Sequence, residues 1–349
     1  MPRHLTAFCI SMLLSSVLAP VVQAGNPLPP PDARLDNAAC KAVPTAPGPH
    51  SLLALSGSSR LLVSSHDRRH FERAGTIEDY DTATRLLRQL PRTGEPADLV
   101  LRPHHMDSLT KNGETLLYVI NHDDDNPNGT RHSILIYKVE PDRLVWRQRL
   151  RDPLLSSPNH ISIAPDGDVY VSNDRRDGSS VMELALRMSR ANIVLYREDR
   201  PEGQRWRIVA DGLSFPNGVK ADARQVLVAM TFGNALLTFP RNRDGSLGAA
   251  RTVIHLPALD GINPGPDAGT YLVVSHGPLL DFLRHQNDSR KRSSGILYLV
   301  NAVTGKASAF FSDDGSRISA MSNAVFSQNA LYIGQSFDSF LLRCPLQKT

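Results

Sequence analysis

Short apolar runs separated by turn residues recur along most of the chain, and they predict β-strands. Runs such as SILIYKV (133–139) and NIVLYRE (192–198) are rich in the β-branched and aromatic residues typical of strands, and Gly, Asn and Asp turns bound them. Only two segments show a helical pattern, VMELALRMSR (181–190) and LLDFLRHQ (279–286). The long helices that follow each strand in Rossmann and TIM-barrel folds are missing. The pattern therefore predicts an all-β protein with two short helical inserts.

The apolar runs belong to a unit that recurs six times. Each unit has a polar beginning, an apolar run, a turn and a second apolar run, as in PNHISIAPDGDVYVSND. The units occupy residues 49–67, 103–123, 158–174, 216–234, 259–277 and 322–338. Copies at spacings of about 40–60 residues are typical of four-stranded propeller blades. The sequence therefore predicts a six-bladed β-propeller, with its ring closed by the N- and C-terminal strands.

A polar side chain near the start of each unit is a second repeating feature. We call these residues the heads: His50, His104, Asn159, Asn217, Asp260 and Asn323. The innermost strands of a propeller surround its central channel and begin at one mouth. Ring closure is therefore expected to gather the heads around one ion or substrate group. The alternative is that each head only satisfies N–H groups at its own strand end, as Asn and Asp often do.

The N-terminal residues differ in composition from the rest of the chain. Residues 1–24 contain Arg3, an apolar run and Val22-Gln23-Ala24, a pattern typical of a cleaved secretory signal. Residues 25–39 are Pro-rich and are expected to form an extended lead-in, which leaves 40–349 for the propeller. No later segment approaches ~20 unbroken apolar residues, so no transmembrane anchor is expected. These features predict a secreted or periplasmic protein.

The cysteines fit an exported protein. Cys9 lies in the signal segment, which leaves Cys40 and Cys344 near the two ends of the mature chain. An even pair of cysteines in an exported protein favours a disulfide, and two separate buried thiols are the alternative. A bridge between Cys40 and Cys344 would tie the first strand to the last.

Charge and short motifs narrow the function classes. The net charge of +4 is scattered, and the densest basic cluster, Arg290-Lys291-Arg292, contains no aromatic residues. It is therefore interpreted as a solvated face, and no nucleic-acid partner is predicted. The sequence contains no G-x-S-x-G, H-E-x-x-H, C-x-x-C or G-x-G-x-x-G motif. Serine-hydrolase, zincin, redox and dinucleotide-binding interpretations are thereby excluded.

A set of weak motifs becomes specific when their order and spacing are considered together. They run from Cys40 to Cys344 and comprise Pro103-His104, Val-Ile-Asn-His at 119–122, Asn159-x-Ile161, Phe-x-Asn-Gly at 215–218, Asp260-x-Ile262 and Ser275-His276. In these motifs the chain resembles the paraoxonase/arylesterase family, within the gluconolactonase and senescence-marker-protein superfamily. The resemblance implies a six-bladed propeller with two calcium ions in its channel, one of them catalytic, that hydrolyses lactones and aryl esters.

The resemblance also assigns roles to individual residues. It implies that Asn159, Asn217 and Asp260 are ligands of the catalytic metal, with His50 at or beside a position where the family has Glu, and Gly261 where it has Asn. The family's His–His dyad is retained as His104 and His122. Two Asp ligands of the deeper calcium are replaced by Ser51 (or Leu52) and by His160. His160, His276 and Asn323 are expected in the pocket wall.

These replacements change the expected metal chemistry. Calcium binds six to eight oxygen ligands and favours carboxylates. The upper site retains one carboxylate and gains an imidazole, so it is predicted to bind calcium with additional waters or a metal that accepts mixed ligands, such as Zn, Mn or Fe. The deeper site is expected to have lost its calcium.

The sequence thus predicts a secreted, metal-dependent hydrolase of small-molecule lactones or aryl esters. A lactonase needs an electrophile for the carbonyl oxygen and a base for water. His104 is the predicted base, with His122 orienting it or relaying its proton, and Asp260 is the alternative base or nucleophile. Two other interpretations stay open: a propeller that has lost its calcium and serves as a binding scaffold, and a metal-free propeller of the strictosidine-synthase type.

Overall fold

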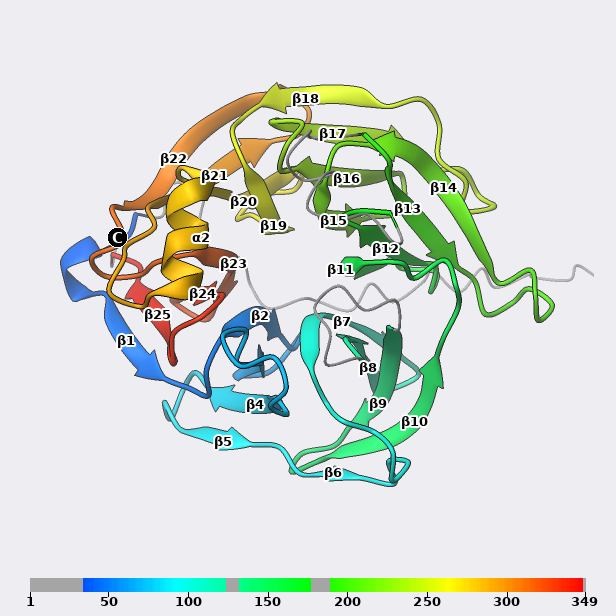
Figure 1. Cartoon of the computed structure of the whole chain (residues 1–349), viewed down its shortest axis with the longest axis horizontal. Helices are drawn as coiled ribbons and strands as arrows, with labels where there is room; N and C mark the ends of the chain where they lie inside the picture. The colour runs from blue at the N-terminus through cyan, green and yellow to red at the C-terminus, as the bar shows by residue number, and fades with distance from the viewer. Residues whose placement is uncertain (1–33, 124–131, 177–188, 348–349) are drawn as a thin grey trace, which may run out of the picture.

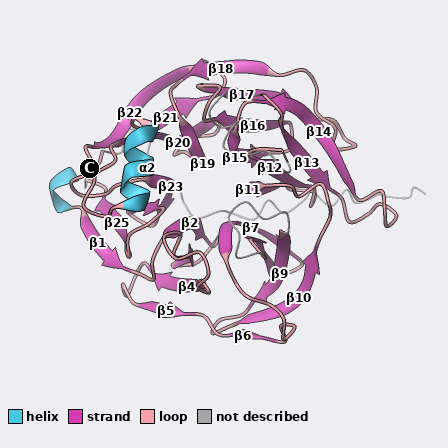
Figure 2. Cartoon of the chain, viewed as in Figure 1, coloured by secondary structure: helices cyan, strands magenta, loops and turns pink. Residues whose placement is uncertain are grey.

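The computed structural model describes residues 34–123, 132–176 and 189–347. These residues form six β-sheets arranged as blades around a central axis (Figure 1). Strands dominate the ring, as Figure 2 shows, so the prediction of an all-β, six-bladed propeller is confirmed. The helical segment predicted at 279–286 is α2 (Leu279–Asn287), whereas the segment at 181–190 lies almost entirely outside the described residues. Among the described helices, none has the length and apolar character needed to cross a bilayer.

Each blade is a sheet of at least four strands, and its two innermost strands come from one of the six repeated units. The first two blades contain β2 (Pro49–Ala54), β3 (Arg60–Ser65), β4 (Thr76–Asp81) and β5 (Leu87–Gln89), then β7 (Pro103–Lys111), β8 (Glu114–Asn121), β9 (Ser133–Val139) and β10 (Leu144–Leu150), with β6 (Arg92–Thr93) parallel to β10.

The remaining blades follow the same order from the axis outwards. The third and fourth contain β11 (Pro158–Ile163), β12 (Val169–Asn173), β13 (Ala191–Tyr196) and β14 (Trp206–Leu213), then β15 (Pro216–Ala221), β16 (Gln225–Met230), β17 (Ala235–Pro240) and β18 (Arg251–His255). The fifth and sixth contain β19 (Leu259–Pro264), β20 (Thr270–His276), β21 (Gly295–Asn301) and β22 (Lys306–Asp313), then β23 (Met321–Ser327), β24 (Ala330–Gln335), β25 (Phe340–Pro345) and β1 (Lys41–Pro44).

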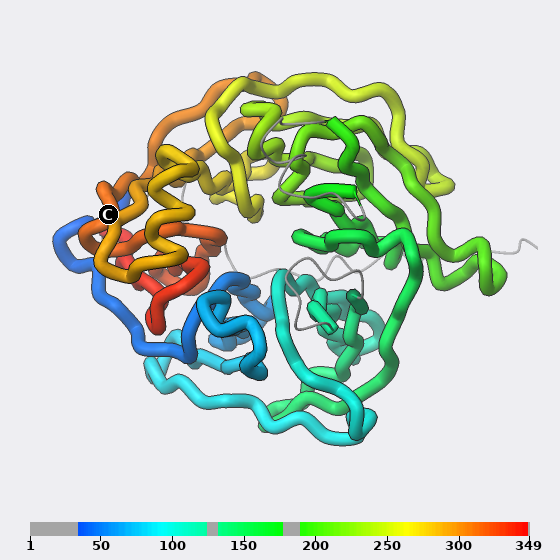
Figure 3. The backbone as a smooth tube through the Cα atoms, viewed as in Figure 1, coloured from blue at the N-terminus to red at the C-terminus, as the bar shows by residue number. Residues whose placement is uncertain are grey.

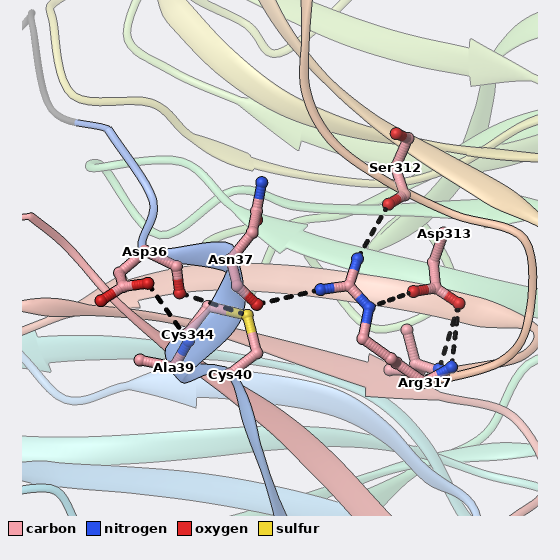
Figure 4. The surroundings of a disulfide bond; sticks show 9 residues. Asp36, Asn37, Ala39, Cys40, Ser312, Asp313, Arg317 and Cys344 are labelled. Atoms are coloured by element: carbon pink, nitrogen blue, oxygen red, sulfur yellow. Dashed lines mark hydrogen bonds and ion pairs between the residues drawn. A yellow bond between two sulfur atoms is a disulfide. The ribbon is translucent and has the colours of Figure 1, made fainter.

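The two ends of the chain close the ring together. β1 pairs antiparallel with β25, so the N-terminal strand completes the last blade (Figure 3). The predicted Cys40–Cys344 disulfide is present and joins residues 304 positions apart. The residues before Cys40 also pack on this blade, through a Leu35–Leu346 bridge and a 3-10 helix, η1 (Asn37–Ala39). Arg317 donates a hydrogen bond to the carbonyl oxygen of Asn37 and pairs with Asp313 beside the disulfide (Figure 4).

The hydrophobic core is divided among the blade interfaces. One cluster of buried apolar side chains fills each interface, and Leu52, Val63 and Tyr80 of the first blade meet Tyr332 and Leu341 of the last. The other described clusters join the remaining neighbouring blades in the same way. Burial of apolar area on both faces of each sheet explains the near-continuous apolar runs of the inner strands.

Every innermost strand begins with a β-bulge. The pairing of β2, β7, β11, β15, β19 and β23 with the next strand shifts within the first residues of each. A bulge places extra residues on one strand and redirects their side chains. The first five heads lie inside these bulges, so the local backbone turns them out of the sheet alternation. This feature positions the site described below.

Candidate functional site

Five of the six heads meet in one pocket. His50, His104, Asn159, Asn217 and Asp260 line a cavity of about 540 Å³ at the start of the inner strands. All five side chains are buried. The expectation that ring closure gathers residues far apart in the sequence therefore agrees with the geometry for these five positions.

The pocket has an apolar wall above its polar floor. Phe215 and Phe232 line one part, and Leu279, Phe282 and Leu283 of α2 line another. α2 lies over one side of the ring beside β23 (Figure 1). Phe282 packs against both His276 and Phe337, with ring centroids 4.7 and 5.1 Å apart. Apolar walls with a few convergent polar groups are typical of sites for small organic molecules.

Asp260 forms a buried pair with His276. Nε2 of His276 lies 2.9 Å from Oδ2 of Asp260, and both side chains are 5% exposed. The pairing of β19 with β20 brings them together, because Leu259 lies opposite Ser275 and the backbone N–H of His276 donates to the carbonyl oxygen of Ala258, two residues before Asp260. Nδ1 of His276 is buried and has no hydrogen-bond partner among the described residues. A carboxylate that accepts from Nε2–H leaves Nδ1 as a free proton acceptor.

The predicted dyad residues His104 and His122 are neighbours. Their ring centroids are 5.0 Å apart, and the rings of His104 and His50 are 4.2 Å apart. Nδ1 of His122 lies 2.9 Å from Nδ1 of His132, and within the described chain no hydrogen bond joins His122 to His104. Burial lowers the pKa of His50, His104 and His122 well below 6.5, and the charge of Arg68 acts in the same direction. These imidazoles are therefore neutral at pH 7.

Arg68 adds a positive charge to the pocket, and the sequence analysis did not identify it. It follows β3 in the segment Asp67-Arg68-Arg69 and lines the cavity. Its Nη2 lies 3.5 Å from Nδ1 of His104. Arginine offers only donors, so Nδ1 of His104 must be the acceptor and its proton resides on Nε2. Nδ1 of His104, which accepts from Arg68, is therefore not free to take a proton from water.

Asn159 and Asn217 present unpaired oxygens. Nδ2 of Asn159 donates to Asp174 at 3.1 Å, and Nδ2 of Asn217 donates to Thr231 at 3.4 Å. The Oδ1 atoms of both amides are buried and find no partner in the part of the chain that the structure describes. A buried acceptor of this kind needs a donor or cation from solvent or from a ligand. Asp174 is a second pocket residue that the sequence analysis missed, although the repeated units at 49–67, 103–123 and 158–174 all end in Asp.

A deeper layer of the channel holds the other predicted pocket residues. His160 stacks on His105 with ring centroids 3.2 Å apart, and Nε2 of His105 lies 3.3 Å from Nδ2 of Asn323. Asn323 also accepts a hydrogen bond from Asn263. The bulge of the last inner strand lies at Ser322, so Asn323 is one residue further along than the other heads. The structure therefore separates His160 and Asn323 from the five heads of the upper pocket.

Comparison with models of protein families shows the family to which the chain belongs. The model of the arylesterase family matches residues 71–346, which is most of the chain. The chain belongs to the arylesterase family. The match includes the bulges of the second to sixth inner strands and therefore four of the five heads that line the pocket.

Individual relatives of this family member are distant. The chain is 25% identical over 258 residues to Mechanosensory abnormality protein 6 of Caenorhabditis elegans, covering 70% of this chain and 66% of that protein, which is just under two thirds of its length. Among solved structures, it resembles a gluconolactonase from Xanthomonas campestris, with TM-score 0.55, 16% identity and coverage of 93% and 97%. It also resembles a calcium-binding protein, regucalcin, from Agrobacterium tumefaciens, with TM-score 0.52, 11% identity and coverage of 93% and 97%. The similarity to these two solved structures shows the fold of the chain.

The described residues of the upper pocket do not supply the full ligand set of a calcium site. It offers two carboxylates and the two amide oxygens of Asn159 and Asn217. Oδ2 of Asp260 already contacts His276, and Asp174 already accepts hydrogen bonds from Ser157 and Asn159. Calcium binds six to eight oxygens, with carboxylates providing most of the charge. The Arg68 guanidinium lines the same cavity and would repel a dication. In the described part of the chain, no three His, Cys, Asp or Glu side chains are placed to hold a metal ion jointly.

The deeper layer fits calcium no better. Of the two positions at which the family resemblance implies Asp ligands, one holds Ser51 (or Leu52) and the other holds His160, whose ring stacks on His105. Oγ of Ser51 accepts a hydrogen bond from the N–H of Met106 at 3.2 Å. Burial lowers the pKa of His160 to about 3, with a smaller contribution from the charge of Lys220. A neutral imidazole stack therefore fills this part of the channel.

Proposed function

We propose that this arylesterase-family chain hydrolyses small lactones or aryl esters in the upper pocket, with the Asp260–His276 pair activating water. The observation that carries the proposal is the free Nδ1 of His276, an imidazole whose other nitrogen is 2.9 Å from a buried carboxylate. A carboxylate in this position fixes the tautomer and stabilises the imidazolium that forms. Membership of the family supports the reaction class.

The pocket matches the needs of such a substrate. The ring or acyl group would pack against Phe215, Phe282 and Phe337, while the ester group faces the polar floor. Water would add to the carbonyl carbon as its proton moves to Nδ1 of His276. The C–O bond of the ester then breaks, and the same proton passes to the departing alkoxide or phenoxide oxygen. The products are a carboxylic acid and an alcohol or phenol, joined in one hydroxy acid when the substrate is a lactone.

His104 is a weaker candidate for the base than His276. Its Nδ1 faces the Arg68 guanidinium, and protonation there would place two positive groups 3.5 Å apart. His104 and His122 are therefore assigned to the pocket wall. Because both rings are neutral, they add no positive charge to the site.

We also propose that the protein is exported by a cleaved signal at residues 1–24, followed by a Pro-rich lead-in. The Cys40–Cys344 disulfide supports an oxidising compartment. The signal and most of the lead-in lie outside the described residues.

Parallel kinetics of three variants test the assignment of the base. His276→Gln should lower kcat for phenyl acetate and for γ- and δ-lactones by ~10²–10⁴-fold, the usual contribution of a general base. His104→Gln should cause a smaller loss, and His255→Gln, an exposed residue of β18, serves as the control. A large loss in His104→Gln with a small loss in His276→Gln would assign the base to the His104–His122 pair instead. A folded wild-type protein without any hydrolysis would favour the binding scaffold.

A further inference from the structure

Arg68 is held in the pocket by neutral groups. Its Nη1 donates to the carbonyl oxygens of Gly48 and His66, each at 3.3 Å, and its Nη2 faces Nδ1 of His104 at 3.5 Å. Gly48 has a positive φ of 66°, and a Cβ there would collide with the His66 carbonyl oxygen and lie 2.8 Å from that of Ser336. The backbone of the loop is thus shaped to accept the guanidinium at this position.

The charge of Arg68 is not neutralised by an ion pair. Among the described residues, no carboxylate lies within ion-pair distance of it, whereas its neighbour Arg69 pairs with Asp338 at 2.9 Å. Arg241, whose side chain is 4% exposed, pairs with both Asp166 and Asp168. Burial lowers the pKa of Arg68 to about 10, and the more distant charge of Asp260 opposes that shift, so the guanidinium stays protonated at neutral pH.

An arginine with this combination of features is suited to bind an anion. A guanidinium presents several N–H donors in a plane and binds carboxylates in a bidentate manner. The charge-assisted bonds gain strength where water is excluded. The surrounding imidazoles of His50, His104 and His122 are neutral and do not compete for the anion.

We propose that Arg68 is the anion-binding residue of the upper pocket, where it binds carboxylates without a metal ion and, during hydrolysis, the negatively charged oxygen that develops from the ester carbonyl. The part concerning hydrolysis rests on the proposed function, whereas carboxylate binding does not. The guanidinium takes up no proton in the reaction; it donates hydrogen bonds to an oxygen whose charge grows as water adds. It would thus supply the electrophile that the family resemblance assigns to calcium.

Binding of benzoate to chelator-treated protein tests the proposal independently of turnover. Benzoate combines a carboxylate for Arg68 with a ring for the phenylalanine wall. Isothermal titration calorimetry should detect binding to the wild type, and Arg68→Gln should weaken it by at least about tenfold because the charge-assisted hydrogen bonds are lost. Arg68→Lys retains the charge but not the planar fork, so it should bind with intermediate affinity. Arg251→Gln on the exposed edge of β18 removes the same charge elsewhere and is the matched control.

Two outcomes would overturn the proposal. One is equal benzoate affinity in Arg68→Gln and the wild type, and the other is binding that appears only after calcium is restored. If Arg68→Gln does not fold, Arg68→Lys decides the question. A benzoate affinity of Arg68→Lys equal to that of the wild type would then overturn the proposal. Kinetics separate the two claims: Arg68→Gln should lower kcat by ~10²–10³-fold, as for removal of an oxyanion donor. Arg68-dependent benzoate binding in a protein that hydrolyses nothing would uphold the anion site and reject the proposed function.

Discussion

Acidification should destabilise this protein steeply, because its channel is built from neutral histidines. Burial lowers the pKa of six of them, which are His50, His66, His104, His105, His122 and His160. In the unfolded chain each would titrate near 6.5, so below that pH the unfolded state binds more protons than the folded state and stability falls. Lowering the pH from 7 to 5 should cost about 2 kcal/mol for each such histidine that stays neutral when folded.

If all six stay neutral in the folded protein, the sum is about 12 kcal/mol, comparable with the whole stability of an ordinary domain. His160 offers the cleanest single test, because the pKa in the folded protein is about 3 and the side chain lies below the upper pocket. His160→Gln should reduce the pH dependence of the unfolding free energy by about 2 kcal/mol between pH 7 and 5. Each variant is compared with itself at pH 7, so any uniform cost of the substitution cancels.

Urea unfolding at a series of pH values measures this dependence. The control is His255→Gln, which removes an exposed imidazole from β18 and should leave the pH dependence as it is in the wild type. A wild-type stability that is constant between pH 7 and 5 would refute the reasoning, since the histidines would then be equally protonated in the folded and unfolded states. So would a His160→Gln variant with an unaltered slope.

Three further predictions concern the disulfide that closes the ring, the loop that holds Arg68, and the Asp260–His276 pair. Replacing Cys40 and Cys344 with serine should lower the unfolding free energy by about 5 kcal/mol in the chain-entropy model for a loop of this length, seen as a lower urea midpoint, whereas an unchanged midpoint would contradict it. Gly48→Ala should cost about 1–3 kcal/mol in thermal or urea unfolding, because alanine must adopt a positive φ against a backbone carbonyl; full stability would argue against this geometry. Asp260→Asn should lower kcat by ~10²–10⁴-fold with little effect on KM, and an unchanged kcat would remove the Asp260–His276 pair from the mechanism.

The blades and most heads were predictable from sequence because their signals are local and repeated. Each unit contains its own apolar period, turn and polar head, so the register of β11 could be inferred from that of β7 or β15. The disulfide was predictable for a similar reason, since only two cysteines lie outside the N-terminal segment 1–24. Asn323 was placed among the upper heads because its unit was aligned without the bulge, which lies at Ser322.

The rest of the site depends on contacts that carry no periodic signal. Arg68 belongs to a loop, and the carbonyls that hold it come from Gly48 and His66, so only the folded backbone shows that its guanidinium lines the pocket. The Ser275-His276 motif was recognised in the sequence, but its partnership with Asp260 is visible only through the pairing of β19 with β20. The stack of His105 on His160 likewise requires the third dimension.

If the upper pocket hydrolyses esters with its own side chains, hydrolysis should need no metal ion. The most direct measurement is the initial rate of hydrolysis of phenyl acetate and of γ- and δ-lactones by wild-type protein freed of metal ions with a chelator and checked for metal by elemental analysis. Turnover should persist in the metal-free protein and should be unaffected by added calcium. A folded, metal-free protein that hydrolyses none of these substrates, or one whose activity appears only when calcium is restored, would contradict it.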